Sequence, residues 1–121
     1  MDLKVKLYLV DEEGEKFMGI GVMWLLKELS RCGSLRQAAY NMDISYSKAL
    51  LMVNRLEKHL GKSVIERKKG GQDRGGAVLS TFGKRFVNLY NSFQDEAKKR
   101  TEEPFREFVR SLDILLEDGD E

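Results

Sequence analysis

The sequence has one cysteine, one histidine and one proline, and no apolar run long enough to cross a bilayer. Cys32 alone cannot form an intrachain disulfide, which fits a reducing compartment. A Cys/His zinc site needs about four ligands, and only Cys32 and His59 are available. His59 also lies in a strongly helical stretch, so a Ser-His-Asp triad is not expected. We therefore predict no metal site, no catalytic residue, no cofactor and no enzymatic activity.

The N-terminus lacks the hydrophobic segment of a signal peptide, since it reads Met1-Asp2-Leu3-Lys4. Without such a segment or a membrane-spanning run, the chain is expected to be cytoplasmic and to have no membrane partner. Its 121 residues suit one domain, or one domain with an appended segment. A core of this size would be helped by pairing with a second copy of the chain.

The net charge of +1 conceals an uneven distribution. Residues 34–85 contain eleven Lys or Arg residues and four Asp or Glu residues, which gives this stretch a net charge of +7 and leaves −6 for the rest. A basic centre with acidic flanks is typical of a protein that binds a polyanion. Charge clusters also occur on ordinary solvated surfaces, so charge alone leaves both interpretations open.

The N-terminal half predicts a strand, a turn and three helices. Apolar and polar residues alternate over Leu3–Val10, which is typical of a half-buried strand, and a second short strand near Phe17 would complete a hairpin. Apolar residues at helical spacing predict a helix over about residues 19–31. A second helix opens with the capping-box pattern Ser34-Leu35-Arg36-Gln37. A third covers about residues 45–60, from a capping serine to a terminal glycine.

The third helix has two distinct faces. At about 100° per residue, an apolar stripe that would face the core gathers on one side; it consists of Ala49, Val53, Leu56 and Leu60. The opposite face and its flanks mix small, polar and basic residues with one leucine; they are Tyr46, Ser47, Lys48, Leu51, Asn54, Arg55 and Lys58. Glu57 is the only acidic residue between positions 44 and 65, which is unusual for a solvated helix face.

The C-terminal half predicts a β-hairpin and a long helical segment. Residues 64–69, which end in Lys68 and Lys69, and residues 77–80 flank a glycine-rich loop that carries Arg74, and this hairpin (here the wing, residues 67–78) would have a basic tip. Helical spacing then runs from Thr81 to residue 116, with an interruption at Pro104. Residues 117–121 are predicted to be a disordered tail.

This order of elements is that of a winged helix-turn-helix. The predicted fold class is mainly α with a small β-hairpin, plus C-terminal dimerisation helices. The domains would be a winged helix-turn-helix DNA-binding domain over residues 1–80, a helical dimerisation segment over 81–116 and the tail. The same fold can also serve as a protein-interaction module, so the alternative is an adaptor that does not bind DNA.

Several short segments resemble known regulators. The runs Gly33–Ala39 and Ile44–Ala49 resemble LysR-type DNA-binding domains. A closer similarity, over roughly residues 3–90, is to the N-terminal DNA-binding domain of the molybdate-responsive (ModE-type) regulators; it depends on Ser45–Ala49, Ile65–Arg67 and Gly75–Ser80. The resemblance implies a dimeric bacterial or archaeal transcription regulator, with Ser45, Tyr46 and Ser47 at the start of the recognition helix.

The sequence also departs from that pattern. Full-length members carry C-terminal molybdate-binding domains, and since this chain ends at residue 121 we expect no molybdate site in it. Leu50 occupies a position where the family usually has an aromatic residue.

We predict a sequence-specific regulator that binds duplex DNA as a homodimer, with the third helix in the major groove and the wing on the backbone. The expected DNA-binding residues are Ser34, Arg36, Ser45, Tyr46, Ser47, Lys48, Leu51, Asn54, Arg55, Lys68, Lys69 and Arg74. The expected dimerisation residues are Phe82, Phe86, Tyr90 and Phe93. The alternative for these aromatic residues is packing onto the core of their own subunit.

Overall fold

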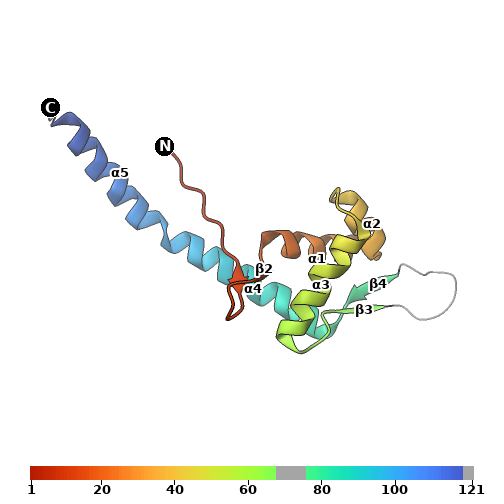
Figure 1. Ribbon diagram of the computed structural model, residues 1–121. Helices are drawn as coiled ribbons and strands as arrows, with labels where there is room; N and C mark the ends of the chain where they lie inside the picture. Colours follow the sequence, from red (N-terminus) through yellow and green to blue (C-terminus); the bar gives the residue numbers. More distant parts are fainter. Residues whose placement is uncertain (68–75, 119–121) are drawn as a thin grey trace. The chain divides into compact units, whose positions relative to one another are not determined.

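The computed structural model describes residues 1–67 and 76–118 (Figure 1). In chain order the elements are β1 (Leu9–Val10), β2 (Lys16–Met18), α1 (Ile20–Cys32), α2 (Leu35–Asn41), α3 (Tyr46–Leu60), β3 (Ile65–Arg67), β4 (Ala77–Leu79), α4 (Thr81–Arg100) and α5 (Glu102–Glu117). β1 pairs with β2 and β3 pairs with β4, both antiparallel. The predicted fold class, mainly α with a small β-hairpin in a winged helix-turn-helix, is confirmed.

The chain divides into two compact units, and the division falls within α4. Residues 7–89 form the first unit, which contains both hairpins, α1 to α3 and the start of α4. The second consists of residues 1–6 and the chain from Tyr90 onward.

The ends of the first three helices follow the sequence signals closely. Gly33 and Gly61 have φ of 73° and 70°, a left-handed conformation that favours glycine, and each donates its N–H to the carbonyl four residues earlier at 2.8 Å. Ser34 Oγ accepts from the N–H of Gln37 at 3.1 Å, and Ser45 Oγ accepts from the N–H of Lys48 at 3.0 Å.

Two local predictions were wrong. The capping box is not closed, because the Gln37 amide donates to Asn41 Oδ1 at 2.8 Å instead of turning back to Ser34. The strand predicted over Leu3–Val10 is shorter, because β2 pairs only with Leu9 and Val10. The side chains of Val5, Leu7 and Leu9 nevertheless remain less exposed than their neighbours, as the alternation predicted.

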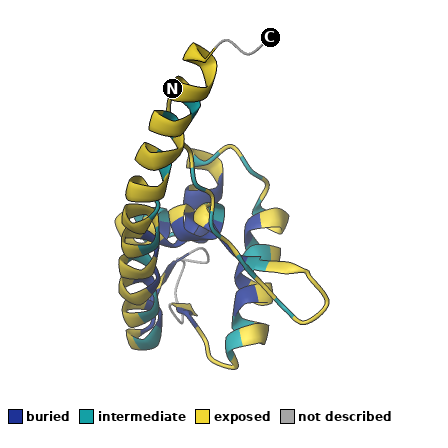
Figure 2. Cartoon of the chain, turned by 90° about the vertical axis from the view of Figure 1, so that its left-hand side faces the viewer, coloured by how far each residue is buried: buried dark blue, intermediate teal, exposed yellow. Residues whose placement is uncertain are grey.

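The core of the first unit is centred on α1 (Figure 2). α3 contributes Ala49, Val53 and Leu56 from its predicted apolar stripe, and Leu60 is half-buried. The largest fully buried side chains are Met18, Met23, Leu25, Leu26, Leu29, Leu35, Val53, Leu56 and Val64.

The β3–β4 hairpin is fastened to the segment in front of α2. Its register pairs Ile65 with Leu79 and Arg67 with Ala77. The Ala77 N–H donates to the Gly33 carbonyl at 3.0 Å, and Ser34 forms an isolated bridge with Gly76. The base of the wing and the N-terminus of α2 are therefore held side by side.

The start of α4 packs tightly against the two residues that precede β3. Ser80 Oγ donates to the Ser63 carbonyl at 2.7 Å and accepts from the Gly83 N–H at 2.8 Å. Gly83 lies so close to the residue before β3 that a Cβ placed on it would be 2.1 Å from the Val64 carbonyl oxygen. Only glycine fits here without displacing backbone.

The sequence predicted a break in the C-terminal helices at Pro104. In the structure the break lies at Thr101. Pro104 instead occupies the first turn of α5, where the missing N–H removes no intrahelical hydrogen bond. α5 continues to Glu117, so this residue, which was assigned to the tail, is helical. The other tail residues, apart from Asp118, lie outside the described part of the chain.

Candidate nucleic-acid interface

α3 presents its predicted reading face to solvent. The exposed side chains on this face and its edges are Ser47, Lys48, Leu51, Asn54 and Arg55. Ser45 is exposed just before the helix, and Tyr46 is half-buried. Leu51 is 49% exposed, although large apolar side chains near a core are normally covered. The structure thus brings these predicted residues of the helix to one surface.

Arg36 and Tyr46 meet at the junction of α2 and α3. The Arg36 guanidinium carbon lies 4.1 Å from the centroid of the Tyr46 ring, which is within the range of a cation–π interaction. Both residues were predicted to lie on the DNA surface, but their mutual contact has no signal in the sequence. Because the pair joins the two helices of the helix-turn-helix, it fixes the Arg36 side chain beside the start of α3.

Glu57 has a structural role that sequence reasoning missed. Its carboxylate oxygen Oε2 accepts from the Val64 N–H at 2.8 Å and from the Ile65 N–H at 3.3 Å. The acid therefore joins the end of α3 to the start of β3. Its isolation among basic and polar residues was the only sequence signal for this role.

Part of the predicted wing surface is described. Arg67 ends β3 with an exposed side chain. The predicted phosphate contacts Lys68, Lys69 and Arg74 lie outside the described residues.

Two neighbouring hollows border α3 on the side of β2. A hollow of about 290 Å³ is lined by Lys16, Phe17, Gly19, Gly21, Val22, Lys48, Met52 and Arg55. A smaller one, of about 170 Å³, is lined by Asp11, Glu15, Lys16, Phe17, Arg55, Lys58 and His59. The first contains three cationic side chains and no carboxylate. Lys16 was not predicted as a site residue, because it stands alone in a β-hairpin far from α3 in the sequence.

The N-terminal hairpin is attached to α3 through His59. The imidazole stacks on the Phe17 ring with centroids 4.3 Å apart, and His59 Nε2 lies 3.5 Å from Asp11 Oδ2. The hydrogen bond from the Glu15 N–H lowers the pKa of the Asp11 carboxyl most; desolvation opposes it, and the Glu13 N–H and the nearby His59 lower the pKa further. His59 is therefore a packing residue, in keeping with its sequence context.

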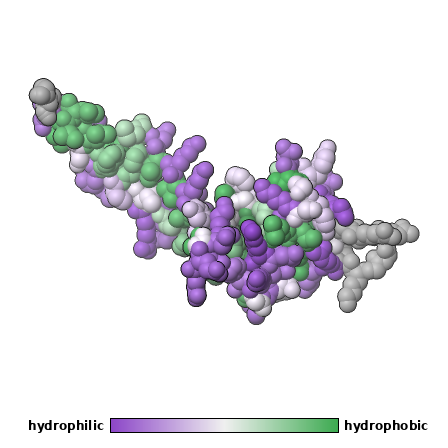
Figure 3. All heavy atoms as spheres, viewed as in Figure 1, coloured by the Kyte–Doolittle hydropathy of each residue, from purple (hydrophilic) through white to green (hydrophobic). Residues whose placement is uncertain are grey.

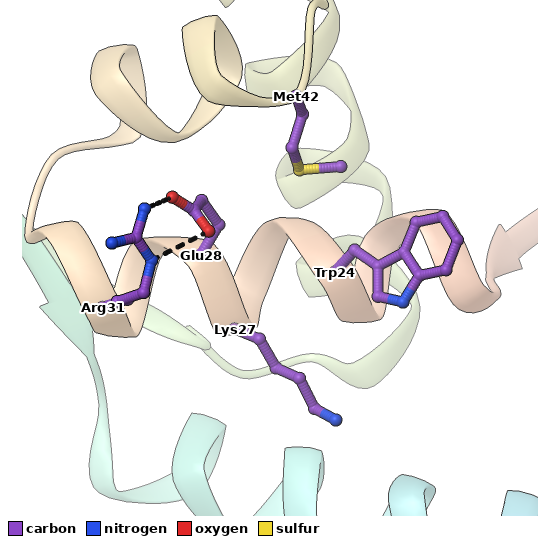
Figure 4. A pocket seen from close by; sticks show the side chains of 5 residues that line it. All are labelled: Trp24, Lys27, Glu28, Arg31 and Met42. Atoms are coloured by element: carbon purple, nitrogen blue, oxygen red, sulfur yellow. Dashed lines mark hydrogen bonds and ion pairs between the residues drawn. The ribbon is translucent and has the colours of Figure 1, made fainter.

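A third hollow, of about 420 Å³, lies along α1 and is shown in Figure 4. Trp24, Lys27, Glu28, Arg31 and Met42 line it. Glu28 bonds to the guanidinium of Arg31 and accepts from the Asn41 side chain at 2.6 Å, so it joins α1 to the end of α2. The hydrogen bond from Arg31, and then that from Asn41, lowers the pKa of the Glu28 carboxyl.

The predicted dimerisation residues differ in accessibility. Phe82 and Phe86 are half-buried and stack on each other at 6.3 Å, and Lys62 Nζ lies 5.4 Å from the Phe82 centroid. Tyr90 is only 3% exposed, and burial raises the pKa of its hydroxyl. Phe93 is 47% exposed and lies against Tyr90, with ring centroids 6.1 Å apart.

α5 is amphipathic and buries none of its residues. Its large exposed apolar side chains, which Figure 3 shows as green atoms near the C-terminal end, are Phe108, Ile114, Leu115 and Leu116. Phe105, Val109 and Leu112 on the same helix are half-buried.

The described residues contain neither a metal-ligating cluster nor a membrane-spanning helix. Residues 1–67 and 76–118 contain no group of three or more His, Cys, Asp or Glu side chains that could hold a metal ion. Over the same residues, no helix has both the length and the apolar character needed to cross a membrane.

Comparison with known proteins assigns the helix-turn-helix to a family. Residues 22–84, about half of the chain, match the family model described as bacterial regulatory helix-turn-helix protein, lysR family. The chain belongs to this family. The matched segment runs from α1 to the start of α4 and so contains the whole of the α2–α3 pair.

Curated relatives of this lysR-family chain match over about half of its length. It is 39% identical over 67 residues to the transcriptional regulator ModE of Haemophilus influenzae, and 37% identical to the DNA-binding transcriptional dual regulator ModE of Escherichia coli. Each match covers 55% of this chain and 26% of the relative. The chain therefore matches about a quarter of the length of these relatives. The predicted resemblance to the N-terminal part of ModE-type regulators is confirmed.

Solved structures support the fold of this lysR-family member. The DNA-binding domain of CbnR, solved in complex with DNA, aligns with a TM-score of 0.56 and 19% identity, covering 71% of this chain and 93% of that one. OxyR of Corynebacterium glutamicum aligns with a TM-score of 0.52 and 20% identity, covering 68% of this chain and 24% of OxyR. At these identities the likeness concerns the fold alone.

Proposed function

We propose that this chain is a DNA-binding transcription regulator that acts as a homodimer, with α3 in the major groove of duplex DNA. The observation that carries the proposal is the outward face of α3. Lys48, Asn54 and Arg55 are exposed there, while the only acid of the helix, Glu57, is bonded to the backbone of residues 64 and 65. This face belongs to a helix-turn-helix of the lysR family.

The residue types on this face suit base readout. Asn54 can form a bidentate pair with adenine, and Arg55 can reach guanine or a phosphate. Leu51, exposed between them, can contact the methyl group of thymine. Tyr46, Ser47 and Lys48 would contact base edges or nearby phosphates.

Residues around α2 and the wing would position the protein on the backbone. Ser34, Arg36 and Ser45 would hold phosphates, together with unpaired N–H groups of the helix starts. Arg36 suits this role because its stacking on Tyr46 holds it at the α2–α3 junction. Lys68, Lys69 and Arg74 would follow the backbone from the wing.

The dimer contact would be made by the helical segment 81–116. Phe93 and the uncovered apolar face of α5 offer surface for a second copy. Phe82, Phe86 and the buried Tyr90 would support that surface from α4.

The first test is fluorescence anisotropy with a labelled duplex from the upstream region of the protein's own gene, beside a scrambled duplex, over a range of salt concentrations. Steeply salt-dependent binding is expected because phosphate contacts release counterions, and tighter binding to the upstream duplex would indicate sequence reading. Arg55→Ala and Lys69→Ala should each weaken binding. If neither changes the affinity, the assigned face is wrong.

The absence of binding to both duplexes at low salt would contradict the proposal. The remaining role for the fold would then be a protein-interaction adaptor.

A further inference from the structure

We infer that Lys16 of the N-terminal hairpin joins Lys48 and Arg55 in a second phosphate-binding surface, which contacts the DNA backbone on the side of α3 that faces β2. This surface is here called the β2 flank. The inference rests on the proposed function, since it concerns the strand of DNA that α2 and the wing would not reach.

The β2 flank is defined by the hollow between β2, the start of α1 and α3. All three cationic side chains line this hollow of about 290 Å³, and none of its lining residues is acidic. Gly19 and Gly21 form part of its wall, so no bulky side chain fills the space at the beginning of α1. The first turn of α1 also contains no acid.

The geometry of α3 separates this surface from the one already proposed. At about 100° per residue, Tyr46 and Lys48 point to opposite flanks of the helix. Tyr46 faces α2 and contacts Arg36, whereas Lys48 and Arg55 face the hollow beside β2. The exposed Ser47, Leu51 and Asn54 lie between these two flanks.

A helix inserted in the major groove has phosphates on both sides. The groove is about 12 Å wide and a helix fills most of it, so each flank of the helix faces one backbone. Arg36, the start of α2 and the wing serve one flank. The β2 flank offers cations to the other, and Lys16 extends it beyond α3.

The cations of the β2 flank are available for a phosphate. No described residue forms an ion pair with Lys16, Lys48 or Arg55. Lys16 Nζ lies 5.4 Å from the Tyr8 ring, a cation–π contact that leaves the charge unneutralised.

Two carboxylates, Asp11 and Glu15, line the neighbouring smaller hollow, which Lys16 and Arg55 also line. Asp11 accepts from the N–H groups of Glu13 and Glu15 and faces His59. Neither carboxylate forms an ion pair with Lys16 or Arg55 among the described residues.

The test compares two variants with the same loss of charge. Lys16→Gln removes the cation from the β2 flank, and Lys27→Gln removes one from α1 at the hollow beside Trp24. The salt dependence of binding is measured for both variants and the unaltered chain, with the upstream duplex and the scrambled duplex. Thermal unfolding followed by circular dichroism checks that each variant folds.

Loss of one phosphate contact lowers the slope of log K against log salt by about 0.9. Between about 50 and about 200 mM salt, the affinity of Lys16→Gln should therefore fall some three- to fourfold less than that of the unaltered chain. The effect should be the same on both duplexes, since phosphates carry no sequence information. Lys27→Gln should keep the original slope, and Lys16→Arg should restore it.

An unchanged slope for a folded Lys16→Gln overturns this inference while leaving the proposed function intact. An equal fall of the salt slope in Lys16→Gln and in Lys27→Gln would also overturn the inference, because the change in net charge alone would then explain the effect. If the unaltered chain shows no salt-dependent binding to either duplex, the proposed function fails as well. If Lys16→Gln does not fold, Lys16→Ala takes its place in the test. An unchanged salt slope for a folded Lys16→Ala would then overturn the inference.

Discussion

At the scale of single residues, Gly83 is the position where one added carbon atom has the largest effect. Its Cβ would be 2.1 Å from the Val64 carbonyl oxygen, and that atom belongs to backbone that cannot rotate away. We expect Gly83→Ala to lower the free energy of unfolding by roughly 1–3 kcal/mol or more, as overpacking does. Urea denaturation would measure it.

Gly21→Ala is the matched control for this prediction. Gly21 also lies in the first turn of a helix, but its Cβ would only touch the Met52 methyl at 3.9 Å. Since alanine favours a helix over glycine by roughly 0.5–1 kcal/mol, this change should be neutral or stabilising. Equal destabilisation by the two substitutions would contradict the steric explanation.

Ser45 provides a second prediction at this scale. Its hydroxyl accepts from the Lys48 N–H and caps α3. Ser45→Ala should lower the free energy of unfolding by about 1 kcal/mol, because a donor at the start of the helix loses its partner. Ser47→Ala, at an exposed position within the same turn, should change stability by less than about 0.5 kcal/mol. Chemical denaturation of both variants would distinguish a capping role from a general effect of removing a hydroxyl.

At the scale of elements, the link between α1 and α2 depends on the ionised form of Glu28. Arg31 and Asn41 both bond to this carboxylate and lower its pKa from the usual value of 4.5. A lowered pKa in the folded state means that the stabilisation is complete above about pH 4.5 and is lost as the pH falls through the folded-state pKa. Glu28→Gln should therefore reduce stability at pH 7, with a difference that shrinks towards pH 3.

Urea denaturation at the two pH values would measure this effect. Glu12→Gln serves as the control, since Glu12 is exposed in a turn. A constant difference between Glu28→Gln and the unaltered chain at both pH values would show that the charge of Glu28 does not matter.

The elements with the strongest local signals were also those that the sequence predicted best. Gly33, Gly61, Ser34 and Ser45 mark helix ends through conformation or hydrogen bonds within a few residues, so their roles can be deduced without tertiary structure. The outward face of α3 followed in the same way from its period.

The missed features depend on contacts between residues of different helices and strands. Glu57 bonds to β3, Arg36 stacks on Tyr46, and Lys16 shares a hollow with Arg55. None of these contacts has a periodic signal, because each arises when packed elements bring separate segments together. The break was predicted at Pro104 because proline interrupts helices, but proline is tolerated in a first turn, where Pro104 lies.

At the scale of the whole molecule, the exposed apolar face of α5 gives the sharpest prediction. Leu115 is 62% exposed and shares the apolar stripe with Phe108 and Leu112, whereas Ile114 is 58% exposed on the opposite face. If the stripe forms the proposed dimer contact, Leu115→Asp should shift the chain to monomer. Ile114→Asp should leave the dimer intact, although it introduces the same charge at similar exposure.

Sedimentation velocity at tens of micromolar would separate these outcomes. A monomeric unaltered chain at this concentration would contradict the dimer proposal. Equal dissociation by both substitutions would place the contact elsewhere than on the stripe.

The attachments of α3 have a consequence for protein engineering. An exchange of α3 alone between relatives would replace Glu57, so the hydrogen bonds to the N–H groups of Val64 and Ile65 would be kept only by chance. A chimera should instead transfer residues 33–83 as one cassette, which carries the bridge from Ser34 to Gly76 and the Ser80 joint intact. Under the proposed function, transfer of DNA preference between scaffolds therefore requires α3 together with the base of the hairpin that braces it.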